Sequence, residues 1–176
     1  MTGSGVVVLE HIPSLSDKHP DGVNEIALHG ILKSVKGSDD FVQDTYDRAM
    51  HIGQRLVQIA DAHKPDYVVF ETPSLASKGN ATRTLPMLLG SLLTQLSNTL
   101  SREGVKLVTV PPTSLKKFAT GRGDATKDQM VEAIEDKEPE FYQELMALPK
   151  SKGRYDLADA FWLSQWVLHY HILERE

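Results

Sequence analysis

Length, composition and charge limit what this chain can be. It has 176 residues, of which 40% are hydrophobic and 24% charged, so we expect one domain with one core over residues 1–176. There is no cysteine, which excludes disulfides and thiolate metal sites and fits a cytoplasmic protein. The net charge of -5 argues against a basic surface over the whole protein, so any surface for nucleic acid must be local.

Targeting and membrane segments are not visible in the sequence. The longest nearly apolar run, Leu85 to Leu93, is interrupted by Pro86, Gly90 and Ser91. It is far shorter than the roughly 18 residues that a membrane-spanning helix needs. The N-terminus lacks the basic and apolar pattern of a secretory signal. We therefore expect no membrane partner.

The first third of the chain predicts a hairpin followed by a helix. Val6 to Leu9 is a β-branched run typical of a strand, and a weaker strand follows around Glu25 to Lys33. The stretch from Pro13 to Gly22 is polar and would form a long loop between them. Apolar residues then recur at spacings of three and four from Asp39 to Ala62, with Ser38 and the acids after it as the helix start.

The remaining elements predict a parallel crossover and two more helices. Tyr67 to Phe70 and Val105 to Val110 are buried strands, and the helix from Thr84 to Arg102 connects them. Prolines 111 and 112 end the second of these strands. Further helices are predicted over Lys127 to Glu135 and Asp156 to Leu173. The order indicates an α/β fold with a mixed sheet flanked by helices.

Basic residues gather in two short segments. The first contains Lys116, Lys117, Arg122 and Lys127, and the second contains Lys150, Lys152 and Arg154. Taken alone, either cluster reads as a solvated face. Their closeness to acidic residues that are candidates for metal binding favours a role in contacting phosphates.

Three carboxylates are candidate metal ligands. Glu71 ends a buried strand, where open α/β sheets place their ligands, although a surface acid is equally compatible. Asp156 and Asp159 stand three residues apart and share one face of the final helix. Acids in a first helical turn are often only capping residues. Here Leu157, Ala158 and their neighbours are apolar, so a divalent cation is one way to compensate the pair.

Two segments of the chain resemble the RuvC-type Holliday junction resolvases of the RNase H-like superfamily. The first runs from Leu115 to Lys127, where Lys116, Gly121, Gly123, Ala125 and Lys127 fall on a similar family pattern. The second is Tyr155-Asp156-Leu157-Ala158-Asp159-Ala160, which is similar to the family's final Asp-x-x-Asp-Ala helix. Phe70-Glu71 at a strand end completes the match, and the sequence resembles phage-encoded members most.

The resemblance implies a structure-selective endonuclease that cuts branched DNA in recombination, repair or phage genome processing, in a bacterial or phage-infected cell. It implies two Mg²⁺ or Mn²⁺ ions held by carboxylates, with Glu71, Asp156 and Asp159 among the ligands. Lys127 would act at the cut. Contacts to DNA would come from Lys116, Lys117, Arg122, Lys78 and Arg83. Symmetric cutting of two strands implies a homodimer, and Thr84 to Arg102 would supply either a dimer face or core.

The N-terminus departs from the family pattern. Family members begin with a strand carrying an Asp, and Met1-Thr2-Gly3-Ser4-Gly5-Val6 resembles the region after that strand. The resemblance therefore implies that the first, central strand and the first metal carboxylate lie outside these residues. Either about ten further residues precede Met1, which we favour, or another element fills the gap. We expect weak or absent cleavage by these 176 residues. The alternatives are a non-catalytic binder of branched DNA and an RNase H-like nuclease acting on flaps or RNA.

Overall fold

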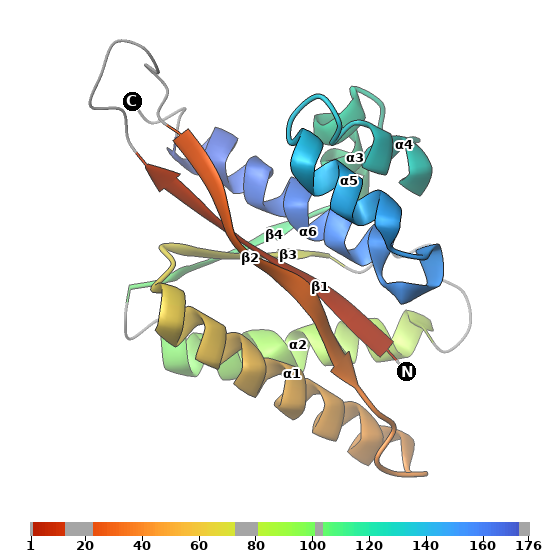
Figure 1. The fold of residues 1–176 in the computed structure, drawn as a ribbon. Helices are drawn as coiled ribbons and strands as arrows, with labels where there is room; N and C mark the ends of the chain where they lie inside the picture. Colours follow the sequence, from red (N-terminus) through yellow and green to blue (C-terminus); the bar gives the residue numbers. More distant parts are fainter. Residues whose placement is uncertain (1, 13–22, 73–80, 101–103, 173–176) are drawn as a thin grey trace. The chain divides into compact units, whose positions relative to one another are not determined.

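A computed structural model describes residues 2–12, 23–72, 81–100 and 104–172 (Figure 1). The elements follow in the order β1 (Thr2–Ile12), β2 (Val23–Ser34), α1 (Phe41–His63), β3 (Tyr67–Glu71), α2 (Ala81–Leu100), β4 (Lys106–Val110), α3 (Pro112–Thr120), α4 (Lys127–Glu132), α5 (Pro139–Ala147), the 3₁₀ turn Lys150–Lys152, α6 (Arg154–Val167) and the π turn Leu168–Ile172. This order confirms the expected α/β fold class. Among the helices that the structure describes, none is both long enough and apolar enough to cross a membrane.

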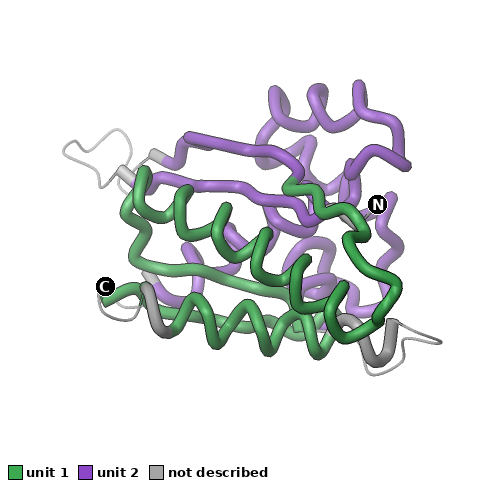
Figure 2. The backbone as a smooth tube through the Cα atoms, turned by 90° about the horizontal axis from the view of Figure 1, so that it is seen from below, with its two compact units in different colours: residues 1–3, 32–112 green, residues 4–31, 113–176 purple. Residues whose placement is uncertain are grey.

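The chain divides into two compact units (Figure 2). The first contains residues 1–3 and 32–112, and the second contains residues 4–31 and 113–176. The division does not follow a linker, because the β1–β2 hairpin contributes residues to both units. The expectation of a single domain stays a prediction.

The hairpin at the start of the chain is longer than its hydrophobic runs indicate. β1 has 11 residues and β2 has 12, and the two strands form a two-stranded sheet with their arrows in opposite directions (Figure 1). Polar pairs extend it beyond the apolar run, as where His11 Nδ1 lies 2.9 Å from Asn24 Oδ1. Cross-strand pairs of this kind stabilise strands that hydrophobic periodicity alone does not predict.

The first unit is built on a parallel strand pair and two packed helices. β3 and β4 are parallel, and their register joins Tyr67 to Lys106 and Glu71 to Val110. As predicted, a helix, α2, connects them. The core of this unit contains Ala60, Leu96 and Leu100, with partly buried apolar residues of both strands around it. Leu96 is fully buried, so at this position α2 supplies core.

Helix α1 begins and ends on local hydrogen bonds. Asp40 is its N-cap, and the carboxylate accepts a hydrogen bond of 2.8 Å from Gln43 N–H. At the other end Lys64 adopts a left-handed conformation with φ 46°, and its N–H donates to Ala60 O. The helix therefore starts two residues after the predicted Asp39, because the acid at 40 is the residue that caps the first turn.

Two helices were not predicted from the sequence. α3 begins directly at Pro112, and α5 begins at Pro139. A proline in the first turn of a helix removes only an N–H that would have no partner there, so both Pro112 and Pro139 can start a helix. In the acidic stretch from Glu132 to Glu144, Phe141 is buried and Leu145 lies four residues on, also buried. That spacing forms the apolar face of α5.

The second unit has its own core around α6. The helix packs on α4 and α5, and its buried residues include Leu157, Ala158, Phe161 and Trp162. Trp162 Nε1–H donates a 2.8 Å hydrogen bond to Met130 O, which joins α6 to the end of α4. The predicted helix from Asp156 to Leu173 therefore begins earlier, at Arg154, and ends at Val167 before a π turn.

Candidate metal and nucleic-acid site

The two aspartates of α6 lie where the sequence predicted them, on the first turns of the helix. Gly153 is the N-cap, with φ 98°, and no side-chain hydrogen bond caps this end. Asp156 lies in the first turn, and Asp159 lies one turn later. The side chain of Asp159 is only 17% exposed. Neither carboxylate is needed as the N-cap residue, which weakens the simple capping explanation.

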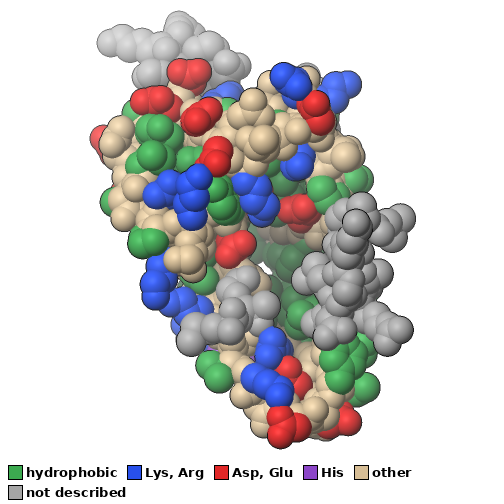
Figure 3. Space-filling model, turned by 90° about the vertical axis from the view of Figure 1, so that its right-hand side faces the viewer, with side chains coloured by type: hydrophobic (Ala, Val, Ile, Leu, Met, Phe, Trp, Pro, Cys, Tyr) green, Lys and Arg blue, Asp and Glu red, His purple; other side chains and the backbone are tan. Residues whose placement is uncertain are grey.

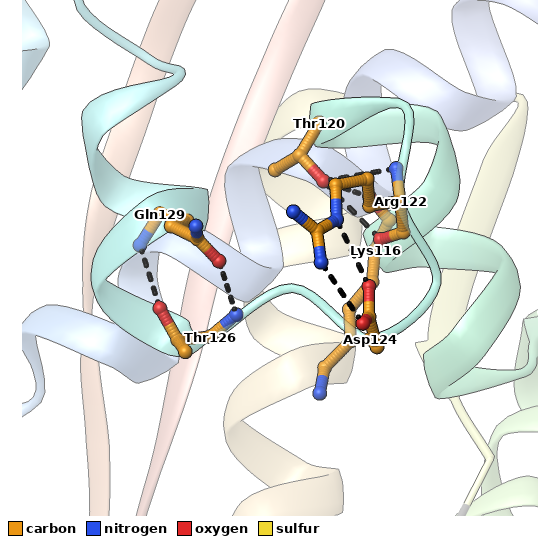
Figure 4. A network of polar contacts seen from close by, with 6 residues as sticks. All are labelled: Lys116, Thr120, Arg122, Asp124, Thr126 and Gln129. Atoms are coloured by element: carbon orange, nitrogen blue, oxygen red, sulfur yellow. Dashed lines mark hydrogen bonds and ion pairs between the residues drawn. The ribbon is translucent and has the colours of Figure 1, made fainter.

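Lys127 lies against this pair. Its Nζ is 2.9 Å from Asp159 Oδ2, although the two residues are 32 positions apart in sequence. Lys127 is the first residue of α4, and a capping box fixes that start (Figure 4). Gln129 N–H donates to Thr126 Oγ1 at 3.2 Å, and Thr126 N–H donates to Gln129 Oε1 at 2.9 Å. The capping box thus fixes the start of the helix whose first residue, Lys127, contacts Asp159.

The electrostatics of the pair favour a nearby cation. Burial is the largest influence on Asp156 and raises the pKa of its carboxyl; Lys127 lowers it, and the negative charge of Asp159 raises it again. The net result is a pKa above the ordinary aspartate value. One lysine therefore does not fully compensate two carboxylates in this half-buried place.

The donor chemistry of the pair suits a hard divalent cation. Carboxylate oxygens are the ligands that Mg²⁺ prefers, and protein-bound Mg²⁺ commonly keeps several waters and only one or two carboxylates. Among the described residues no group of three or more His, Cys, Asp or Glu side chains gathers closely enough to hold a metal. The donor chemistry of Asp156 and Asp159 is therefore that of a Mg²⁺ ion that keeps several waters.

Glu71 is the last residue of β3, as predicted, and its side chain is half-buried. It belongs to the first compact unit, whereas Asp156 and Asp159 belong to the second. Its role as a third ligand stays a prediction. Lys78 lies outside the described residues. Arg83 lies in α2, but its side chain is also outside the part of the chain that the structure describes.

The predicted basic segment forms α3 and the loop after it, and the charges there are partly neutralised (Figure 4). Arg122 makes two hydrogen bonds to Asp124, of 3.1 Å from Nε and 3.0 Å from Nη2. The side chains are 67% and 74% exposed. The carboxylate raises the pKa of Arg122, and Arg122 lowers the pKa of Asp124. Lys117 is exposed and Lys116 half-buried.

The loop backbone has the conformation that its glycines suggest. Gly121 has φ 79°, a left-handed conformation that a residue with a side chain rarely adopts. Thr120 Oγ1 accepts from Arg122 N–H at 3.3 Å and donates to Lys116 O at 2.9 Å. These bonds hold the turn between α3 and Ala125, which is buried. Gly121, which falls on the family pattern, therefore lies in a turn with a left-handed backbone.

In the second basic cluster, Arg154 and Lys150 bond to other groups of the protein. Nε of Arg154 donates a 2.8 Å hydrogen bond to Leu148 O, and its Nη2 donates to Met146 O at 3.1 Å. Arg154 therefore satisfies carbonyls at the C-terminal end of α5. Lys150 forms an ion pair with Asp128. On the face drawn in Figure 3, Lys and Arg side chains lie among Asp and Glu side chains. A continuous basic patch is not visible on this face.

Gly5 is a structural residue of the site that sequence reasoning noted only as part of a pattern. A Cβ added at this glycine would lie 1.9 Å from Asp156 O and 2.8 Å from Leu157 N. β1 thus passes directly against the backbone of the first turn of α6, and only a hydrogen fits between them. In the sequence, Gly5 was only one position of the Met1 to Val6 segment that resembles the family pattern.

Tyr155 and Asp128 were also missed. The hydroxyl of Tyr155 donates a 2.8 Å hydrogen bond to Asp128 Oδ1. Each is the direct neighbour of a predicted site residue, Asp156 in one case and Lys127 in the other. Their pairing could not be predicted, because it depends on how α4 packs on α6.

Comparisons with known proteins give similarity in structure but not in sequence. No protein-family model matches the chain, and no curated protein matches it. A structure of Thermus thermophilus RuvC aligns with a TM-score of 0.62 at 16% identity, covering 95% of this chain and 88% of that chain. Thermus thermophilus RuvC in complex with a Holliday junction substrate aligns with a TM-score of 0.67 at 16% identity, covering 97% and 88%.

The fold is that of RuvC. This bears out the RNase H-like α/β fold expected from the two sequence segments. Because the identity is only 16%, the similarity establishes the fold and leaves the activity to be argued from the residues themselves.

Proposed function

We propose that this chain is a RuvC-like, metal-dependent endonuclease that acts on branched DNA. The observation that carries the proposal is the cluster of Asp156, Asp159 and Lys127, on a fold shared with RuvC. Two half-buried carboxylates with one lysine are a poor arrangement for stability, and they suit a site that receives a cation and a phosphate. The resemblance of the sequence to phage-encoded members is the basis for proposing a role in recombination or phage genome processing.

Asp156 and Asp159 would hold Mg²⁺ or Mn²⁺, with Glu71 and a second ion as further parts of the proposed site. Bound there, the cation would activate water and stabilise the departing oxygen in phosphodiester hydrolysis. The carboxylates must be ionised to bind it, so the raised pKa of Asp156 makes binding weaker as the pH falls.

The lysine beside the pair would serve two states of the site. Without metal, Lys127 balances part of the carboxylate charge through its contact with Asp159. Its side chain is 52% exposed, so its Nζ can also reach solvent and hold a non-bridging phosphate oxygen. In this proposal Lys127 contacts the phosphate at the cut, and Lys116, Lys117 and Arg122 contact the backbone nearby.

The partner would be a four-way junction, bound by a homodimer so that two strands are cut symmetrically. Shape and charge would select it, because phosphate contacts position a protein on DNA without reading its sequence. Intracellular action would follow from this substrate.

The test is competition between a four-way junction, a flap, a linear duplex and an RNA–DNA hybrid, at excess protein with Mg²⁺ and long incubation. We expect tightest binding to the junction and Mg²⁺-dependent nicks near its centre that Asp156→Asn abolishes. Slow cutting satisfies this expectation. Preferential cutting of the flap or the hybrid would contradict the choice of substrate.

A second candidate is a non-catalytic binder of branched DNA. It is favoured by the absence, among the described residues, of a metal site with three acidic or histidine ligands. This candidate predicts tight junction binding that Asp156→Asn leaves unchanged, with no nick in any metal. The same competition experiment therefore separates the two functions.

A further inference from the structure

A polar clamp outside the two metal-binding carboxylates joins α4 to α6. It consists of Tyr155, Asp128 and Lys150. Tyr155 O–H donates to Asp128 Oδ1 at 2.8 Å. Lys150 Nζ lies 2.7 Å from Asp128 Oδ1 and 2.9 Å from Oδ2, so the ammonium contacts both carboxylate oxygens.

The clamp residues are direct sequence neighbours of the proposed site residues on both helices. Tyr155 directly precedes Asp156 on α6, and Asp128 directly follows Lys127 on α4. The hydrogen bond between them therefore joins the first turn of one helix to the first turn of the other. Lys127 and Asp159 lie on these same two helices.

The ring of Tyr155 also contacts the lysine side chains. Lys127 Nζ lies 5.8 Å from the ring centroid, and Lys150 Nζ lies 5.7 Å from it. Both distances are within the range of cation–π attraction. A lysine side chain has many rotamers, so without such contacts its ammonium would sample many positions.

The clamp is charged under ordinary conditions. Hydrogen bonds from Lys150 and Tyr155 hold the pKa of Asp128 below its usual value, and Asp128 raises the pKa of Lys150. Exposed ion pairs contribute little to stability. Hydrogen bonds to an ionised carboxylate are shorter and more directional, so the effect of this cluster is on geometry.

We propose that Tyr155, held by Asp128 and Lys150, is a positioning residue that keeps the Lys127 ammonium beside Asp159 and ready for a phosphate oxygen. The cleavage role rests on the proposed function, whereas the positioning of Lys127 does not. Tyr155 itself touches neither the reacting phosphate nor the metal in this scheme.

The first experiment needs no activity. In protein labelled with ¹³C and ¹⁵N at lysine, the Lys127 side-chain signal is assigned by its loss in Lys127→Arg. We expect a signal typical of an ordered ammonium in the wild type and in the control Tyr142→Phe, which removes a hydroxyl from α5. In Tyr155→Ala and in Asp128→Asn, the signal should move to the position of solvated lysines. An unchanged Lys127 signal in both variants would overturn the proposal.

The second experiment is a double-mutant cycle on junction cleavage, for protein that has passed the first test. Tyr155→Ala should lower the single-turnover rate roughly tenfold and leave the junction Kd unchanged. In the Lys127→Met background the same substitution should have no further effect on the rate, because the residue that it positions is gone. Equal losses in both backgrounds would mean a merely structural role and overturn the proposal. A wild type that does not cut would favour the non-catalytic binder over the proposed endonuclease, and the lysine signal would still decide the positioning independently.

Discussion

Two glycine-to-alanine substitutions of the same chemistry should have opposite effects on stability. At Gly5 the added methyl group would meet the backbone oxygen of Asp156 at 1.9 Å and the amide nitrogen of Leu157 at 2.8 Å. At Gly90, in α2, the methyl group meets nothing within 4 Å. The comparison isolates the close approach of β1 to α6 from the general effect of replacing glycine.

The magnitudes follow from these contacts. A Cβ atom essentially never lies within 3.0 Å of another heavy atom, so Gly5→Ala requires β1 and the first turn of α6 to separate by roughly 1 Å or more. The obstacle is backbone and cannot rotate away. We expect destabilisation of about 3 kcal/mol, the upper part of the usual range for overpacking. In a chain of this size that is a Tm lower by about 6 to 12 °C. Gly90→Ala should stabilise by about 0.5 to 1 kcal/mol, because alanine is the better helix former.

The assay is urea unfolding of both variants, followed by Mn²⁺ titration of the folded protein. Gly5→Ala should also weaken Mn²⁺ binding, because the shifted turn carries Asp156. Gly90→Ala should bind Mn²⁺ as the wild type does. If Gly5→Ala is as stable as the wild type, the reasoning about the contact between β1 and α6 is refuted.

Three further substitutions test the electrostatics and the core. Asp156→Asn should raise the Tm at neutral pH in EDTA. Because the pKa of Asp156 is raised in the folded protein, its ionised form costs stability above that pKa. The gain in Tm from the substitution should therefore vanish as the pH falls to the ordinary aspartate pKa of 3.8. A constant gain across this range would contradict the origin in charge. Asp124→Asn should release Arg122 from its ion pair and tighten junction binding roughly twofold to fivefold at low salt. A filter-binding assay measures this, with Asp136→Asn as the control for net charge. Equal effects of both variants would show that the pairing of Arg122 with Asp124 is irrelevant. Trp162→Phe should lower the free energy of unfolding by about 1 to 3 kcal/mol, because Met130 O loses its buried hydrogen bond. Urea unfolding measures this, with Trp166→Phe as the control. A loss of unfolding free energy no larger than that of the control would contradict the prediction.

Much of the fold could be predicted because its strands and long helices have strong periodic patterns. Tyr67 to Phe70 is a short β-branched and aromatic run, and it lies in β3 as expected. The helix at Pro112 was missed because Pro111 and Pro112 were interpreted only as the end of a strand, and the helix at Pro139 was missed because no element was predicted between Glu135 and Asp156. In both cases the residue starts a helix, and the decisive signal was the apolar spacing after it.

The candidate site was partly predictable for a related reason. Asp156 and Asp159 share a helix face, so spacing alone placed them together, and the resemblance added Lys127. The contacts of Gly5 and Tyr155 depend on tertiary packing between elements far apart in the sequence. Local patterns contain no information about such contacts, so sequence reasoning could not assign them a role.

Metal binding at α6 tests the central claim most directly. Mn²⁺ should be titrated into the wild type, Asp156→Asn, Asp159→Asn and the control Asp136→Asn, and the broadening of amide signals should be followed by NMR. The account predicts saturable broadening centred on residues 154–160 in the wild type and in Asp136→Asn, and its loss in the two α6 variants. Broadening elsewhere in the chain, or broadening at α6 that survives both substitutions, would contradict the claim that Asp156 and Asp159 hold the cation.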